Sequence, residues 1–211
     1  MPATKRLMTP TRLYLMRHGQ VVGYEKKRIN GHDDVKLTQE GILQSGRLGR
    51  RLKGEEITAI YSSDLSRAAE GARIIGQHLG ITPAPPLEGL REKAFGSFEG
   101  LTLEEIQEQF PVELDELMKS WIDYQAPGAE SLEELERRVS DVLAEILERH
   151  HGERIAVIAH GGVNRVILVR ALEMKIEKFF HFEQDYGCLN IIDYYPHGAL
   201  VRLLNGTDAI K

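Results

Sequence analysis

The sequence predicts a three-layer α/β domain, in which helices cover both faces of a mixed, mostly parallel sheet with one antiparallel strand. Short apolar runs alternate along the chain with segments of helical spacing. The run Arg154–Ala159 is rich in β-branched residues, which is typical of a strand buried in a parallel sheet. Only the end of the chain, with Leu189–Tyr195 and Ala199–Leu204 on either side of a Pro-His-Gly turn, has a hairpin pattern.

The first half of the chain supplies two strand–helix units. Arg12–Met16 is apolar and too short for a helix, so we predict it as the first strand. Thr38 is a suitable N-cap for a helix over Gly41–Lys53. Ile57–Tyr61 is the second predicted strand, and the helix after it ends before Gly80.

Capping residues place the remaining helices. Ser63–Asp64 is the predicted start of the helix that follows the second strand. Two capping boxes, Thr102 to Glu105 and Ser131 to Glu134, each open a further helix. Val163–Leu172 is predicted as the helix after the buried strand.

Composition indicates one soluble domain. With 211 residues, 42% hydrophobic and 28% charged, the chain can bury a substantial core over 12–211. We expect residues 1–11 to be a disordered extension. No apolar stretch approaches the roughly 20 residues that a membrane-spanning helix needs. The single cysteine, Cys188, excludes an internal disulfide and favours a cytoplasmic location.

Charge narrows the range of partners. The net charge of −5 argues against nucleic acid as a partner, because such binding requires basic surface. It is compatible with a small phosphorylated substrate, since a few local cations can dominate one pocket. We expect no membrane partner. The sequence leaves the oligomeric state open, a homodimer included.

Chemistry-bearing residues follow three of the predicted strands. Arg17 and His18 come directly after the first strand, and His160 comes directly after the buried strand. Arg67 falls in the first turn of the helix after the second strand. Because ligands bind at the carboxyl ends of parallel strands, we expect these side chains to meet at one edge of the sheet.

The residue types indicate phosphate chemistry. Arginine presents a planar fork of donors that matches phosphate oxygens. Arg17 and Arg67 would also hold His18 neutral, because nearby cations disfavour imidazolium. A neutral ring nitrogen can attack phosphorus and form a phosphohistidine. The amides of Gly161 and Gly162, at a helix N-terminus, would add donors for the same oxygens.

A phosphomonoester also needs a proton donor for its leaving oxygen. Leu90–Gly100 supplies two candidates, Glu92 and Glu99, near Phe95 and Phe98. The residues alone do not choose between these two glutamates.

Each of these residues taken singly has an ordinary structural explanation, and their joint placement carries the argument. A metal site is disfavoured, because the chain lacks His-x₃-His and Cys-x₂-Cys spacing and the arginines would oppose a cation. A P-loop kinase is also disfavoured, because no Gly-x₄-Gly-Lys-Ser/Thr run exists. We therefore expect neither a metal nor a cofactor.

Five motifs, in order along the chain, resemble the histidine phosphatase superfamily: Leu15–Gln20, Leu37–Gly41, Tyr61–Ala68, Leu90–Gly100 and Ala159–Gly162. The resemblance covers nearly all of the chain after residue 11 and implies a phosphoglycerate mutase-like fold.

The resemblance also implies catalytic roles. His18 would be the phosphorylated nucleophile, with Arg17, Arg67 and His160 around the phosphoryl group. The proton donor would be Glu92, which is the first glutamate of its motif.

The superfamily contains phosphatases and cofactor-dependent phosphoglycerate mutases. Mutases of this kind usually carry a longer middle insertion and an asparagine six residues after the nucleophile. Here that position is Tyr24 and the chain is short, which favours a phosphatase. A phosphoglycerate mutase stays an alternative, and a non-catalytic phospholigand-binding module is a remote one.

The tail of the chain contains four short segments, His181–Phe182, Gly187–Cys188, Ile192–Asp193 and Leu203–Gly206. With these segments it resembles the α-ribazole phosphatase branch, which implies α-ribazole 5′-phosphate as substrate and a role in cobalamin synthesis. Gln20 also fits the phosphatase branches, and Gln20 and Tyr24 are further candidate substrate-binding residues. A broad-specificity phosphatase of sugar phosphates and nucleotides is the alternative. Residues 98–130, a predicted helical lid, would set specificity, with Trp121 and Tyr124 either packing the lid or stacking on substrate.

Overall fold

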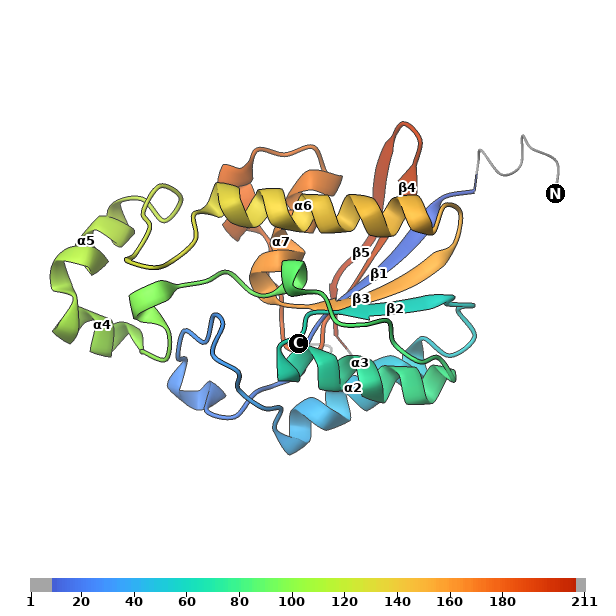
Figure 1. Cartoon of the computed structure of the whole chain (residues 1–211), viewed down its shortest axis with the longest axis horizontal. Helices are drawn as coiled ribbons and strands as arrows, with labels where there is room; N and C mark the ends of the chain where they lie inside the picture. Colours follow the sequence, from blue (N-terminus) through green and yellow to red (C-terminus); the bar gives the residue numbers. More distant parts are fainter. Residues whose placement is uncertain (1–8, 208–211) are drawn as a thin grey trace.

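The computed structural model describes residues 9–207 and shows a single five-stranded sheet (Figure 1). The strands are β1 (Thr11–Arg17), β2 (Ala59–Ser62), β3 (Arg154–Ala159), β4 (Leu189–Tyr195) and β5 (Gly198–Gly206). Their order in the sheet is β2-β3-β1-β4-β5. β1 and β2 both pair with β3 in parallel, and β4 pairs antiparallel with β1 and with β5. β4 is thus the one antiparallel strand, as predicted.

Helices cover both faces of the sheet, which confirms the three-layer fold. α6 and α7 lie on one face, and α2 and α3 lie on the other (Figure 1). These helices are α2 (Gln39–Arg51), α3 (Ser66–Leu79), α6 (Leu132–Arg149) and α7 (Gly161–Ala171). Successive residues of β1 face opposite sides, so Leu13 and Leu15 pack under α6 and α7 while Tyr14 and Met16 pack against α2 and α3.

The predicted caps at Thr38, Thr102 and Ser131 form as the sequence indicates. The side chain of Thr38 accepts a hydrogen bond from the amide of Gly41, at 3.0 Å, and caps α2. Both capping boxes are present, at Thr102 before α4 (Leu103–Gln109) and at Ser131 before α6. Each box satisfies two backbone N–H groups that the helix itself cannot.

Several predicted boundaries differ from the structure by a few residues, and two of these differences have a clear local cause. α3 begins at Ser66 rather than at Ser63–Asp64, because the Ser63 hydroxyl accepts from the amide of Leu65 in a turn before the helix. The predicted extension over 1–11 is wrong at its last residue, since Thr11 opens β1 and its hydroxyl donates to the carbonyl of His150. Residues 1–8 lie outside the described residues.

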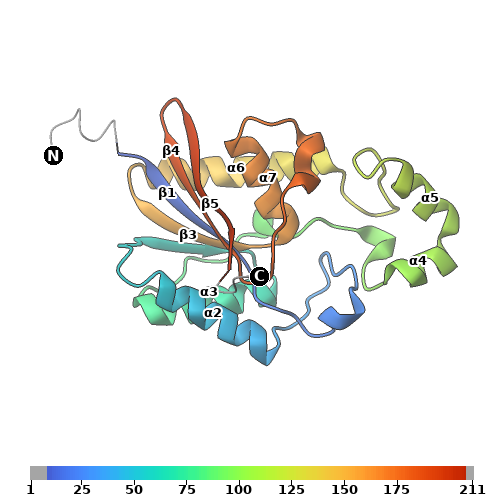
Figure 2. The same ribbon diagram turned by 180° about the vertical axis from the view of Figure 1, so that it is seen from behind.

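Residues 98–130 form a separate small layer at one end of the molecule. α4 and α5 (Pro111–Lys119) project beyond the sheet, as both views show (Figure 1, Figure 2). They close on their own apolar cluster, which includes Phe98, Ile106 and Leu117. Phe110 packs on Phe98, with ring centroids 5.8 Å apart, so it is a packing residue. Within 9–207, no helix is long and apolar enough to cross a membrane.

Candidate active site

The carboxyl ends of β1 and β3 bring His18 and His160 together. The register pairs Arg17 with Ala159, and the next residues along both strands are the two histidines. The amide of His18 donates to the carbonyl of Ala159, at 3.0 Å. The imidazole centroids lie 5.1 Å apart. The predicted meeting of these residues at one sheet edge is therefore observed.

His18 is held in one tautomer. Its Nδ1 lies 2.8 Å from the carbonyl oxygen of Gly19, which can only accept, so Nδ1 carries the proton. Nε2 of the neutral ring then keeps its lone pair. Burial lowers the pKa of His18 well below its usual 6.5, and the charges of Arg17 and Arg67 lower the pKa further. The sequence argument credited the arginines, but burial is the larger cause.

His160 is fully buried and also neutral. Burial is the largest cause that lowers the pKa of His160 well below 6.5, and the charges of Arg67 and Arg17 lower this pKa further. Neither ring nitrogen has a hydrogen-bond partner among residues 9–207, and the same holds for Nε of Arg17. Buried polar atoms are ordinarily hydrogen-bonded, so this cluster of three atoms indicates a polar ligand.

The two arginines are fixed by backbone carbonyls. Nη1 and Nη2 of Arg67 donate to the carbonyls of Asp33 and Gly31, both at 2.7 Å. Arg67 is only 2% exposed, and burial lowers the pKa of its guanidinium. Arg17 donates to the carbonyl of Gln184, at 2.5 Å, and its guanidinium carbon lies 4.0 Å from the ring centroid of Tyr186. Among residues 9–207, neither cation has a carboxylate ion-pair partner that would neutralise it.

The structure separates the two candidate glutamates. Glu92 faces the start of α7, where both carboxylate oxygens accept from the amide of Gly162, at 3.0 and 3.1 Å. Glu99 instead accepts from the amides of His32 and Phe95, at 3.0 and 2.8 Å, and ties two loops together. The carboxylate beside the histidine cluster is therefore Glu92.

The other residues that the sequence predicted to bind substrate or phosphate lie at different distances from the arginine and histidine cluster. Gly161 begins α7, and a Cβ on it would lie 3.7 Å from Nε of Arg17 and 3.3 Å from Nη1 of Arg165. The prediction that the Gly162 amide serves phosphate oxygens is wrong, because that amide donates to Glu92. The amide oxygen of Gln20 accepts from the Thr38 hydroxyl at the start of α2.

Tyr24 lies on the short 3₁₀ helix η1 (Tyr24–Lys26), in the loop after β1. Its side chain is 39% exposed. Its contact with substrate stays a prediction.

An apolar pocket of about 120 Å³ adjoins Glu92 and Gly162. Its walls come from residues 98–130, the predicted lid, from the Glu92 loop, and from α7 and the segment after it. They are mainly apolar and include six aromatic residues: Phe95, Phe98, Trp121, Tyr124, Phe179 and Phe180. Lys93 and Arg165 are the cations of its lining. Trp121 meets Phe180 edge to face with centroids 5.5 Å apart, whereas Tyr124 stacks on Phe98 in the lid core.

Sequence reasoning missed several residues around this site. Arg165 and Tyr186 border the arginine and histidine cluster, and Arg138 and His32 contact the loop that carries Glu92. One usable signal was present for Arg138, because the Ser131 capping box fixes the start of α6 and Arg138 lies two turns later on the same helix. The contacts of His32 and Tyr186 depend on loop paths that carry no periodic pattern.

A neutral histidine with a free Nε2, two fixed arginines and a nearby carboxylate are the parts that phosphoryl transfer through a histidine requires. The fold and this site together define a phosphohydrolase-type enzyme. The chain belongs to the histidine phosphatase superfamily (branch 1), whose family model matches residues 13–207. Its activity class is that of a phosphoric monoester hydrolase.

The relatives include phosphatases of more than one substrate. The chain is 35% identical to the metal-independent phosphoserine phosphatase of Arabidopsis thaliana over 162 residues, which is 76% of this chain and 68% of that protein. It is 28% identical to the adenosylcobalamin/α-ribazole phosphatase of Escherichia coli K12 over 194 residues, which is 92% of this chain and 95% of that protein. The crystal structure of the α-ribazole phosphatase from Shigella flexneri matches with a TM-score of 0.87 and 26% identity, covering 93% of this chain and 96% of that one.

Proposed function

We propose that the chain hydrolyses phosphomonoesters in two steps, through a phosphohistidine at Nε2 of His18. The observation that carries this proposal is the hydrogen bond from Nδ1 of His18 to the carbonyl of Gly19, at 2.8 Å. It leaves Nε2 unprotonated in a buried ring whose pKa is well below 6.5. A nucleophile that is already neutral needs no base to activate it.

In the first step, the bond between Nε2 of His18 and phosphorus forms while the ester P–O bond breaks. Glu92 enters this step in its protonated form and gives that proton to the leaving oxygen, so an alcohol departs and a carboxylate remains. Arg17 and Arg67 bind the phosphoryl oxygens, and the buried N–H of neutral His160 donates to one of them. In the second step, water attacks phosphorus as the bond between phosphorus and Nε2 of His18 breaks, and the Glu92 carboxylate takes a proton from that water. Inorganic phosphate departs, and His18 and Glu92 return to their starting states.

We further propose α-ribazole 5′-phosphate as the preferred substrate, which would place the reaction in cobalamin synthesis in the cytoplasm. The aromatic pocket beside Glu92 and Gly162 supports this choice, because a benzimidazole ring can stack on or meet edge to face with aromatic walls such as Trp121 and Phe180. The α-ribazole phosphatase of E. coli, similar over 92% of this chain, supports it independently.

Phosphate release by protein treated with a metal chelator tests the proposal, with α-ribazole 5′-phosphate, phosphoserine, 3-phosphoglycerate, sugar phosphates and nucleotides as substrates. We expect highest kcat/KM on α-ribazole 5′-phosphate and no release by the His18→Ala variant. Similar rates on all substrates would replace the specific substrate with broad specificity. Isomerisation of 3-phosphoglycerate without phosphate release would instead identify a mutase.

A further inference from the structure

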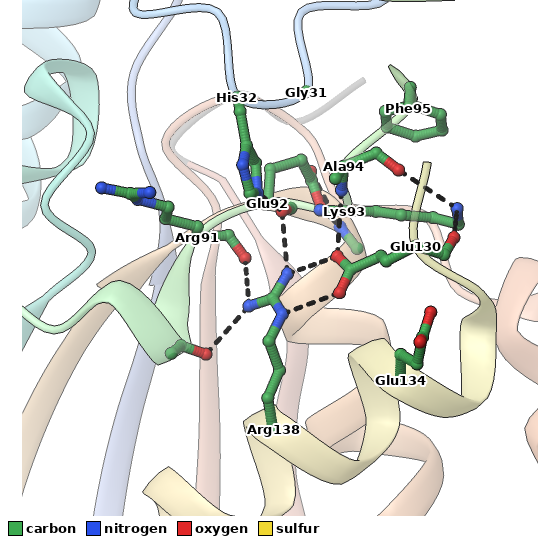
Figure 3. A network of polar contacts seen from close by, with 12 residues as sticks. Gly31, His32, Arg91, Glu92, Lys93, Ala94, Phe95, Glu130, Glu134 and Arg138 are labelled. Carbon is green, nitrogen blue, oxygen red and sulfur yellow. Dashed lines mark hydrogen bonds and ion pairs between the residues drawn. The ribbon is translucent and has the colours of Figure 1, made fainter. Parts of the chain in front are cut away.

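The loop that carries Glu92 is held by a guanidinium from α6. Nη1 of Arg138 donates to the carbonyls of Gly89 and Arg91, at 3.0 and 2.8 Å, and Nη2 donates to the carbonyl of Glu92, at 2.8 Å. The other side of the guanidinium forms a side-on pair with the carboxylate of Glu130, at 2.9 Å from Nε and 2.5 Å from Nη2. Figure 3 shows this arrangement around Glu92.

These contacts use the whole guanidinium. Arginine has five N–H donors, and the protein accepts all five: three backbone carbonyls and two carboxylate oxygens. No donor of Arg138 is left for a substrate, so its function must act through the loop that it binds. One of the three carbonyls belongs to Glu92, the proposed proton donor, and another belongs to Arg91, the residue before it. Arg138 therefore fixes the peptide planes that direct the side chain of Glu92.

Glu130, the partner of Arg138, binds the same loop on the C-terminal side of Glu92. Its Oε1 accepts from the amide of Ala94, at 2.9 Å, and its own amide donates to the carbonyl of Ala94, at 3.1 Å. Nε2 of His32 lies 2.9 Å from the Glu92 carbonyl and shares it with Arg138. The loop is therefore bound before and after Glu92, and the carboxylate of Glu92 points at the amide of Gly162.

We infer that Arg138, paired with Glu130, is a positioning residue that holds Glu92 in place for proton transfer to the leaving group. This inference rests on the proposed function of Glu92. A general acid must lie within hydrogen-bond distance of the leaving oxygen, and a displacement of about 1 Å can lower the rate about 100-fold. The rate should no longer depend on the position of Glu92 when the leaving group departs without a proton.

The test compares two substrates of similar shape. p-Nitrobenzyl phosphate releases an alkoxide that requires a proton, whereas p-nitrophenyl phosphate releases a stabilised phenolate. The ratio of their kcat/KM values reports proton donation in the first step, because that step contains the leaving group. A general loss of folding or of phosphate binding would lower both values and leave the ratio unchanged.

We expect Glu92→Gln to lower the ratio of p-nitrobenzyl to p-nitrophenyl turnover about 100-fold or more. Arg138→Met should lower the same ratio about tenfold or more. Arg138→Lys should do so too, because a single ammonium cannot span the three carbonyls and Glu130 together. Arg138→Lys keeps the charge and most of the stem, and it decides the question if Arg138→Met does not fold.

Arg12→Met is the matched control. Arg12 also forms a side-on pair with a carboxylate, that of the buried Asp193, at 2.6 and 2.9 Å, but at the opposite end of β1 from His18. The Arg12→Met variant should leave the ratio of p-nitrobenzyl to p-nitrophenyl turnover unchanged. If Glu92→Gln leaves the ratio unchanged, the proposed function of Glu92 fails. If Glu92→Gln lowers it while a folded Arg138 variant does not, only the inference about Arg138 is overturned.

Discussion

The carboxylate of Glu92 caps the first turn of α7 from outside the helix, because both of its oxygens accept from the amide of Gly162. This contact joins the proposed proton donor to the helix that begins directly after His160. A side chain at position 162 would occupy the same space, since a Cβ built there overlaps Oε1 of Glu92. The glycine therefore leaves room for the carboxylate.

Gly162→Ala should separate activity from stability. The overlapping atom is the end of a flexible side chain, so Glu92 can move aside, and alanine gains about 0.5–1 kcal/mol over glycine within a helix. We expect an unchanged or higher melting temperature, and kcat/KM for p-nitrobenzyl phosphate at least about tenfold lower. Thermal unfolding and steady-state kinetics check this. A lower melting temperature with unchanged kinetics would contradict it.

The second prediction concerns the charge of the two buried histidines. Because burial lowers the pKa of His18 and of His160 well below 6.5, both rings should stay neutral on acidification to pH 5.5. Heteronuclear NMR of the imidazole nitrogens should show two rings that do not titrate between pH 7.5 and 5.5. Histidines of the urea-unfolded chain, which titrate near 6.5, are the control. Titration of either ring near 6.5 in the folded protein would contradict the prediction.

The same two histidines should make the fold weaker in acid. Below the unfolded pKa of 6.5, the unfolded chain binds protons at positions 18 and 160 that the folded chain does not, so the free energy of unfolding falls as pH falls. The contribution is at most about 1.4 kcal/mol per pH unit for each histidine. Urea unfolding at pH 7.5 and 5.5 measures it. His160→Gln should reduce the loss, and an equal loss in both proteins would contradict the assignment.

The sequence could predict the site because each of its main residues lies next to a regular element. Arg17, His18 and His160 directly follow buried parallel strands, so topology alone brings them to one edge. The choice between Glu92 and Glu99 could not be derived in this way, because both lie in an irregular loop whose path is set by long-range contacts with Arg138 and His32. Family resemblance, rather than periodicity, indicated Glu92.

The wrong predictions also have local causes. A helix start at Ser63–Asp64 is reasonable from capping residues, but the Ser63 hydroxyl closes a turn instead and Asp64 pairs with Arg91, at 2.5 Å. The Gly162 amide was expected to bind a ligand because it lies at a helix N-terminus, yet a carboxylate of the same chain accepts from it. Both outcomes depend on residues far away in the sequence.

Gly19 is required by close packing of backbone against backbone. A Cβ at position 19 would lie 2.6 Å from Cα and 2.7 Å from the carbonyl carbon of Gly41, at the start of α2. Neither partner can move as a side chain could, so Gly19→Ala should lower the free energy of unfolding by about 1–3 kcal/mol. Urea unfolding measures the loss. Gly54→Ala is the control that separates packing from backbone strain. A Cβ built on Gly54 has no neighbouring atom within 4 Å, so alanine there costs only the strain of a positive φ of 89°.

The last prediction tests the aromatic pocket as the binding site for the leaving group. Trp121 lines this pocket and meets Phe180 edge to face, with ring centroids 5.5 Å apart. Trp121→Ala should raise KM for α-ribazole 5′-phosphate about tenfold, because a lost aromatic contact is worth about 0.5–1.5 kcal/mol beyond the lost apolar area. KM for a small substrate such as phosphoserine should change less than about twofold, since it has no ring to stack. Phe110→Leu, in the lid core away from the pocket lining, is the control for loosening of the lid. An equal rise in KM for both substrates, or the same rise in the control, would show that Trp121 supports the lid rather than the substrate.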